Sequence, residues 1–173
     1  MCAALPSLAV RTRVVVVMHH IEAVRSTNTG RLAVAMLQGA SVRLRGARDA
    51  AVEAPPAGRR LVLFPSEGTR PLRPDDAGDD LVLVVPDGTW AQARRVHRRD
   101  PAAQGAEAVT LPSVAASNYN LRRSEREGAL CTVEAIAAAL GVLEGPAVEA
   151  ALREGFEAWR ARAMRVRDGA LAQ

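Results

Sequence analysis

The stretch VVPDGTWAQARRVHRR, residues 84–99, runs from an apolar strand through a turn into a basic helix. Its first residues belong to the run DLVLVV at 80–85, in which the apolar side chains are continuous and do not alternate with polar ones. This pattern is typical of a parallel strand that is buried on both faces. An acid, Asp87, stands where the helix is about to begin, followed by Gly88, Thr89 and Trp90. Two interpretations stay open: an Asp-Gly turn with an aromatic residue packed on the helix, or a ligand site in which the indole shapes the pocket around the acid.

Other apolar runs predict the rest of a sheet. RVVVVM (13–18) and RLVLF (60–64) are continuous like the first run, and AVTLP (108–112) is a weaker fourth. Between and after them, apolar residues at helical spacing predict helices at 29–37, 90–98 and 132–143 and a last helix that begins at Pro146 and places Phe156 and Trp159 in the core. This alternation predicts an α/β fold, a mostly parallel sheet with helices on both faces. The segments 46–59 and 70–80 are predicted to be loops, and the tail at 167–173 is predicted to be frayed.

Length and composition indicate the class of protein. The 173 residues are enough for one domain with a proper core, and 49% of them are hydrophobic. The net charge is +4 and the chain contains no lysine, so arginine supplies the whole basic excess, which is compatible with a polyanionic partner. Cys2 and Cys131 are too few for a disulfide framework or a zinc site. No apolar run is long enough for a membrane span and the N-terminus lacks the pattern of a signal peptide, so we expect a cytoplasmic protein that contacts no membrane.

The segments that follow the predicted strands are the first candidates for a functional site, because open parallel sheets bind ligands at the carboxyl ends of their strands. All four segments are polar: HHIEAVRSTNTGR (19–31), PSEGTRP (65–71), PDGTW (86–90) and PSVAASNYNLRRS (112–124). The first contains His19, His20 and Glu22, but these lack a further ligand at a suitable spacing, so we expect no metal site.

Several of these polar residues also have plain structural explanations. Thr89 and Gln92 form a capping box, which places Asp87 near the positive end of a helix and favours its ionised form. Thr27, Asn28 or Thr29 can cap the helix at 29–37, and Thr132 can cap the next, with Glu134 in its first turn. Cys131 is expected to be a small buried residue and not a nucleophile. The arginines at 94, 95, 98 and 99, with His97, form either a solvated helix face or a phosphate-binding surface.

Five motifs in a fixed order resemble the DTW-domain family: TNTGRLA (27–33), LFPSEG (63–68), PDGTWAQARR (86–95), YNLRRS (119–124) and GALCTVEAIA (128–137). The resemblance covers about residues 10–160 and implies a single domain over 1–173 with a SPOUT-like knotted fold. It implies that the chain is a tRNA-uridine aminocarboxypropyltransferase. Such an enzyme moves the 3-amino-3-carboxypropyl group of S-adenosylmethionine to N3 of a uridine and releases methylthioadenosine. The alternatives are a SPOUT-like S-adenosylmethionine-dependent RNA methyltransferase and a non-catalytic RNA-binding module.

The resemblance also implies roles for individual residues. Asp87 becomes the catalytic residue, either as a general base or as the group that holds the ammonium of the donor. The residues expected to bind S-adenosylmethionine are Pro65, Ser66, Glu67, Pro86, Gly88, Thr89, Trp90, Leu130, Cys131, Thr132 and Glu134. Those expected to bind tRNA are Arg25, Asn28, Thr29, Arg31, Arg94, Arg95, Arg122 and Arg123. Two departures stand out: of an N-terminal cysteine cluster found in many bacterial members only Cys2 is present, and Cys131 replaces a frequent serine.

Overall fold

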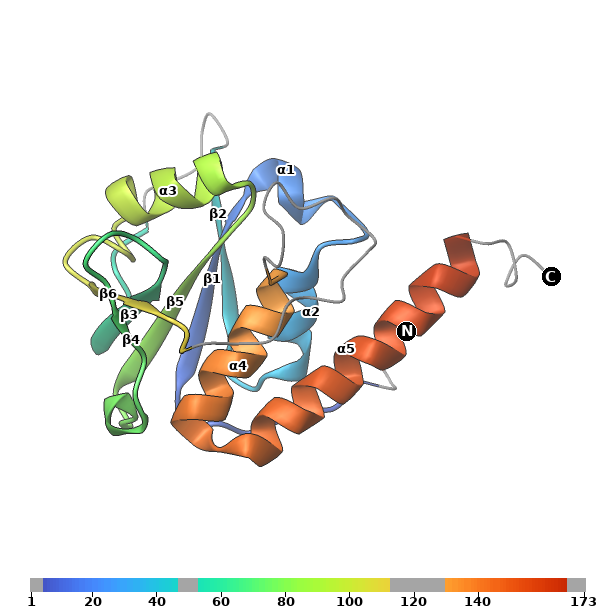
Figure 1. Cartoon of the computed structure of the whole chain (residues 1–173). Coiled ribbons are helices and arrows are strands. Elements are labelled where there is room, and N and C mark those ends of the chain that lie inside the picture. Colours follow the sequence, from blue (N-terminus) through green and yellow to red (C-terminus); the bar gives the residue numbers. More distant parts are fainter. Residues whose placement is uncertain (1–4, 47–52, 113–129, 168–173) are drawn as a thin grey trace.

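A wholly parallel sheet forms the centre of the part of the chain that the computed structural model describes, residues 5–46, 53–112 and 130–167 (Figure 1). It has six strands in the order β2-β1-β5-β3-β6-β4. The bounds are Arg13–His19 for β1, Ser41–Arg45 for β2, Arg59–Leu63 for β3, Arg70–Pro71 for β4, Leu81–Asp87 for β5 and Glu107–Thr110 for β6. The four predicted strands are therefore present, and all described pairings are parallel.

The middle strand β5 pairs with β1 on one side and β3 on the other. Its residues 81–85 are all buried, as are residues 14–18 of β1. Leu83 and Val85 point into one apolar cluster and Val82 and Val84 into a second, on the opposite face of the sheet. Burial on both faces explains why these strands carry unbroken apolar sequence.

Helices cover both faces, as predicted. One face packs against α2 (Thr29–Met36), α4 (Thr132–Glu144) and α5 (Pro146–Arg167), and the other against α3 (Trp90–Arg99). The short helix α1 (His20–Ala23) follows β1 directly, and a single 3-10 turn, η2, spans Pro74–Asp76. Phe156 and Trp159 are buried against the larger cluster, which confirms that they belong to the core. None of the helices in the described ranges has the length and apolar character needed to cross a membrane.

The structure departs from the prediction at the margins of the sheet. The edge strand β2 was not predicted, since its sequence SVRLR is partly exposed and contains only two apolar residues. The predicted loop at 70–80 contains β4 and η2. Strand β5 runs two residues past its predicted end at 85, so Asp87 is the last residue of the strand and not part of the turn.

Two further expectations depend on residues outside the described ranges. The first is the knotted topology, which stays a prediction because the segment 113–129 that joins β6 to α4 lies outside these ranges. Helix α5 continues to Arg167, and residues 168–173 of the tail predicted to fray also lie outside the description.

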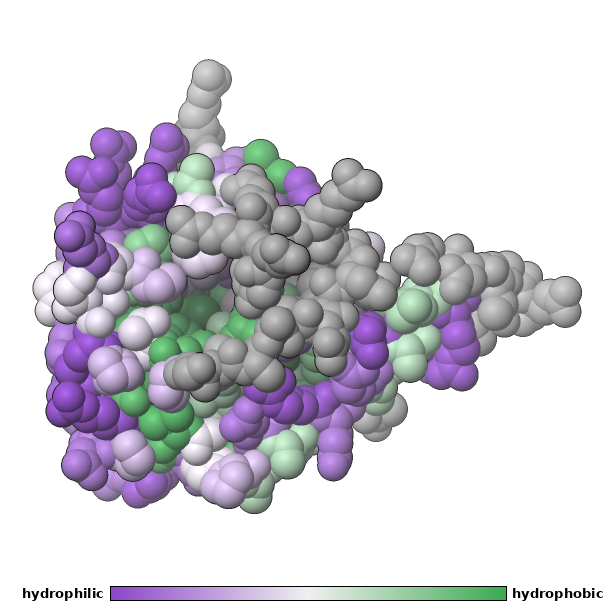
Figure 2. All heavy atoms as spheres, viewed as in Figure 1, coloured by the Kyte–Doolittle hydropathy of each residue, from purple (hydrophilic) through white to green (hydrophobic). Residues whose placement is uncertain are grey.

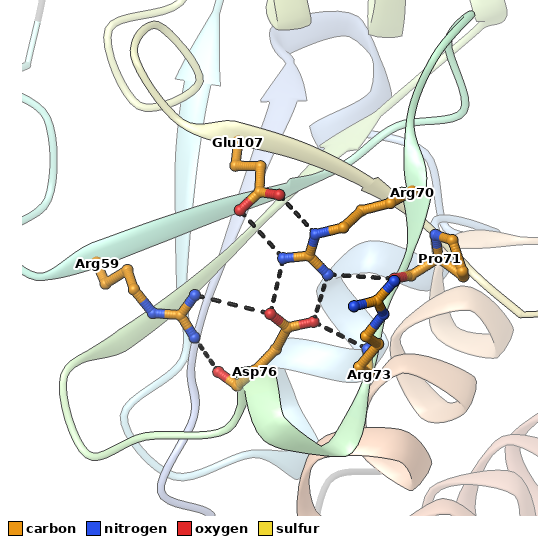
Figure 3. A network of polar contacts seen from close by, with 6 residues as sticks. All are labelled: Arg59, Arg70, Pro71, Arg73, Asp76 and Glu107. Carbon is orange, nitrogen blue, oxygen red and sulfur yellow. Dashed lines mark hydrogen bonds and ion pairs between the residues drawn. The ribbon is translucent and has the colours of Figure 1, made fainter.

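A network of charges fastens the outer strand β4 to its neighbours (Figure 3). The guanidinium of Arg70 donates to both carboxylate oxygens of Asp76, at 2.7 and 2.8 Å, and to Glu107 in β6. The backbone N–H of Arg73 donates to the same Asp76 carboxylate at 2.8 Å. Hydrogen bonds from Arg70 hold the pKa of Asp76 and that of Glu107 below the usual carboxyl range.

Arg70→Gln should therefore destabilise the fold at neutral pH by about 2 kcal/mol, because the buried Asp76 carboxylate loses its bidentate partner. The two carboxyls have lowered pKa values when folded, so their stabilising contribution is present above pH ~4 and is lost as the pH falls through the folded values. Urea unfolding of both proteins at pH 7 and pH 3 measures this, and the difference should shrink at pH 3. Arg73→Gln is the control, since it removes a nearby charge but keeps the backbone bond. An equal difference at both pH values would contradict the prediction.

Candidate functional site

Asp87 lies at the carboxyl edge of the sheet, and its residue is only 5% exposed. Its Oδ2 accepts a hydrogen bond from Nδ2 of Asn28 at 2.7 Å. Its Oδ1 accepts one from the hydroxyl of Thr132. Three segments far apart in the sequence thus meet at one carboxylate, which sequence alone does not show.

Asn28 is fixed in place because it caps α2. Its side-chain oxygen accepts from the backbone N–H of Arg31 at 2.8 Å, so the amide nitrogen is the end that faces Asp87. Of the three candidate caps Thr27, Asn28 and Thr29, it is therefore Asn28 that caps α2. Gly30, in the first turn of α2, approaches so closely that a Cβ there would lie 3.1 Å from Cγ and Oδ2 of Asp87. The carboxylate therefore rests against the backbone at the start of α2.

Helix α4 presents Thr132 to the same carboxylate. Cys131 is the N-cap of this helix, and its backbone N–H donates to Glu134 Oε2 at 2.8 Å. The expectation that Thr132 caps the helix is wrong: Thr132 is the first helical residue, and its hydroxyl donates to Asp87. Burial raises the pKa of the Cys131 thiol to about 12, so the thiol is protonated at neutral pH, in line with the expectation that it is not a nucleophile.

Helix α3 begins just after Asp87 with the predicted capping box. The Thr89 N–H donates to Gln92 Oε1 at 2.7 Å, and the Gln92 N–H donates to the Thr89 hydroxyl at 3.3 Å. Gly88 has φ +142°, and a Cβ there would lie 2.6 Å from Gln92 Oε1, so the turn requires glycine. Helices α2, α3 and α4 all start around Asp87. Their positive ends, together with the two side-chain donors, favour the ionised carboxylate.

Trp90 is half-buried at the start of α3 and packs towards the face of the sheet. Its ring centroid lies 6.3 Å from that of Phe64, which stacks on His97 at 4.8 Å. The indole therefore has a structural role, since it packs the start of α3 against Phe64 just after β3. Its contact with a ligand stays a prediction.

The other residues predicted to bind the donor lie at the same edge. Pro65, Ser66 and Glu67 are exposed directly after β3, the neighbour of β5 in the sheet. The loop closes in a turn in which the Thr69 N–H donates to the Ser66 carbonyl at 3.2 Å. Pro86 and Leu130 are half-buried, and Glu134 is buried. The loops after β3 and β5 and the start of α4 thus surround one region.

The residues predicted to bind RNA have different positions. Asn28 and Thr29 are buried, at 4% and 5% exposure, and Asn28 donates to Asp87, so the structure gives these two side chains little free surface and their contact with RNA stays a prediction. Arg31 is exposed but donates to the Ala23 carbonyl at 2.7 Å, and Arg25 lies 3.5 Å from Glu22. Arg94 and Arg95 are exposed on α3. The last two of the set, Arg122 and Arg123, lie outside the described residues.

Residues 1–164 match the DTW domain. The chain belongs to the DTW-domain family. The DTW letters of the name are Asp87, Thr89 and Trp90 in this chain, the end of β5 and the start of α3. The DTW chain is 32% identical over 157 residues to tRNA-uridine aminocarboxypropyltransferase 2 of Drosophila melanogaster. That alignment covers 83% of the DTW chain and 61% of the relative, so the DTW chain spans about three-fifths of the relative's length.

A solved structure also resembles this DTW chain. It is the SAM-dependent rRNA:acp-transferase Tsr3 from Vulcanisaeta distributa, with 23% sequence identity and a TM-score of 0.45. The match covers 81% of the DTW chain and 70% of the other.

Proposed function

We propose that this DTW protein transfers the 3-amino-3-carboxypropyl group of S-adenosylmethionine to N3 of a uridine in tRNA. Membership of the family and the name of the Drosophila relative support the proposal. The observation that carries it is the buried Asp87 carboxylate, held by Asn28 and Thr132 at the carboxyl edge of the sheet where three helices begin.

The reaction is a displacement at carbon. N3 of uridine attacks the methylene carbon next to the sulfonium, the bond between that carbon and sulfur breaks, and its electron pair stays on sulfur. Methylthioadenosine leaves as a neutral thioether, and the imide proton of uridine goes to a base or to water. Because the sulfonium is already an activated leaving group, the main task of the protein is to present one of the three carbons on sulfur to the nucleophile.

The residues at this edge fit the amino-acid end of the donor. An ionised Asp87 attracts the ammonium group of the donor. Backbone N–H groups at the starts of α2 and α4 favour the carboxylate group of the donor. Asn28 and Thr132 each donate to one oxygen of the Asp87 carboxylate and hold it in place, which suits binding of the ammonium by a fixed negative charge. We therefore assign Asp87 the binding role and expect the exposed loop at 65–67 and Trp90 to contact the remainder of the donor.

Isotope labels test which group moves. Donor labelled in the carboxyl carbon should mark tRNA, donor labelled in the methyl group should not, and methylthioadenosine should accumulate only when tRNA is present. Mass spectrometry of the tRNA nucleosides should find the aminocarboxypropyl adduct of uridine. Methyl label in the RNA would instead establish a methyltransferase. If the protein bound tRNA but released no methylthioadenosine, the result would favour a non-catalytic RNA-binding module.

A further inference from the structure

The outer side of α3 is made almost entirely of arginine. Ala93 and Val96 are buried against the sheet, and Trp90 and His97 flank them, half-buried. At 100° per residue, the opposite side of the helix carries Arg94, Arg95, Arg98 and Arg99, with Ala91 as the only other exposed residue. All four of these arginines are exposed, and we call them the α3 arginine face.

Several arginines elsewhere in the described chain have partners within the protein. Arg70 binds Asp76 and Glu107, Arg60 donates to three backbone carbonyls, and Arg45 pairs with Asp100. On the α3 arginine face, by contrast, none of the four guanidinium groups has an ion pair or hydrogen bond to another described residue, and α3 itself contains no acid. Four like charges gathered on one helix repel one another, so this face gains most from a partner that brings negative charge.

The α3 arginine face adjoins the candidate site. Helix α3 begins three residues after Asp87. The capping box formed by Thr89 and Gln92 fixes the direction in which the helix leaves the edge of the sheet. Burial lowers the pKa of His19, and the charges of His20 and Arg95 lower it further while Glu22 raises it, so Arg95 lies near the end of β1. Figure 2 shows hydrophilic side chains over the region where Figure 1 draws α3.

We infer that the α3 arginine face is the surface on which the phosphate backbone of the RNA docks while the target uridine enters the site at the start of the same helix. This rests on the proposed function for the choice of RNA as the partner. A guanidinium group presents a planar fork of donors that matches phosphate oxygens. Arg94 with Arg98, and Arg95 with Arg99, form two rows at i,i+4 spacing, about 5–6 Å between Cβ atoms, so several phosphates of one strand can be bound together. Arg25 and Arg31, which already contact Glu22 and the Ala23 carbonyl, should contribute less.

The test is a salt titration of tRNA binding without S-adenosylmethionine, using an unmodified tRNA transcript. The α3 variant combines Arg98→Gln and Arg99→Gln, which keep a long helix-forming side chain. The matched control combines Arg162→Gln and Arg165→Gln on α5, two exposed arginines that likewise pair with no other described residue. The slope of log affinity against log salt should fall in magnitude by about 1 for each α3 arginine lost, and affinity at moderate salt should fall on the order of tenfold. The α5 control should bind like the wild type.

A variant that combines Arg98→Lys and Arg99→Lys keeps both positive charges, so it separates the effect of lost charge from an effect on folding. Its slope of log affinity against log salt should stay close to that of the wild type. Equal tRNA binding by the α3 variant and the wild type would overturn the inference, as would an equal loss in the α5 control. Loss of S-adenosylmethionine binding with tRNA binding intact would also overturn it, since the arginines would then serve the donor pocket. Failure of the proposed function looks different: the wild type would release no methylthioadenosine, whether or not its tRNA affinity depends on α3.

Discussion

Asp87→Asn is expected to lower kcat/KM for methylthioadenosine release by about 100-fold or more, with little change in the free energy of unfolding. The substitution removes the negative charge and keeps the shape of the side chain. An enzyme that must orient a cationic donor, or accept a proton, loses the group that does so. The measurement is the rate of methylthioadenosine release over a range of S-adenosylmethionine concentrations with tRNA in excess.

The fold should survive because both hydrogen bonds can be rebuilt. The new amide oxygen can accept from Asn28 Nδ2, and its nitrogen can donate to the Thr132 hydroxyl, which accepts as readily as it donates. Thermal unfolding of the variant serves as the control for this point.

The two roles considered for Asp87 predict different kinetics. If Asp87 holds the ammonium of the donor, as we propose, the KM for S-adenosylmethionine should rise and donor affinity should fall in direct binding measurements. If it acts as a base, kcat should fall at unchanged donor affinity. Wild-type turnover by Asp87→Asn would show that the acid has only a structural role, as the partner of Asn28 and Thr132.

Asn28→Ala is expected to destabilise the protein by about 2.5–4 kcal/mol and to lower kcat/KM on the order of tenfold. The substitution removes the N-cap of α2, typically about 1 kcal/mol, and also a hydrogen bond to a buried carboxylate, about 1.5–3 kcal/mol. Urea unfolding and methylthioadenosine release measure the two effects.

Asn28→Ser separates the two contributions. Serine caps helices as well as asparagine does, but its shorter side chain has no amide to reach Asp87. Stability should therefore recover by about 1 kcal/mol relative to the alanine variant, while kcat/KM stays low. If Asn28→Ser restored both properties, the bond to Asp87 would have no part in activity, and Asn28 would be only a helix cap.

The interior of the fold was predictable because its strands are buried on both faces. The run at 80–85 and the run at 13–18 carry unbroken apolar sequence for that reason, and they are β5 and β1. Strand β2 escaped prediction since an edge strand with one covered face has too few apolar residues to stand out. The extension of β5 to Asp87 passes through Pro86, a residue that argues against a strand when only the sequence is read.

The site was predictable as a region but not as a set of contacts. Polar segments after parallel strands located Asp87, and capping chemistry correctly predicted the pairing of Thr89 with Gln92. Nothing in the sequence shows that Asn28 turns its amide towards Asp87, since that contact depends on α2 lying beside the end of β5. Threonine commonly caps helices, so the sequence predicts Thr132 as the N-cap of α4, but the structure gives that place to Cys131.

The order of the strands also bears on how rapidly different parts of the protein exchange amide hydrogens with water. Strand β5 has a neighbour on each side, so its amides should be released only by global unfolding, whereas those of β2 and β4, at the two ends of the order, should exchange through smaller openings. Asp87 is the last residue of that slowest-exchanging strand. Local fraying at the rim of the sheet can therefore occur many times over without moving the carboxylate away from Asn28 and Thr132.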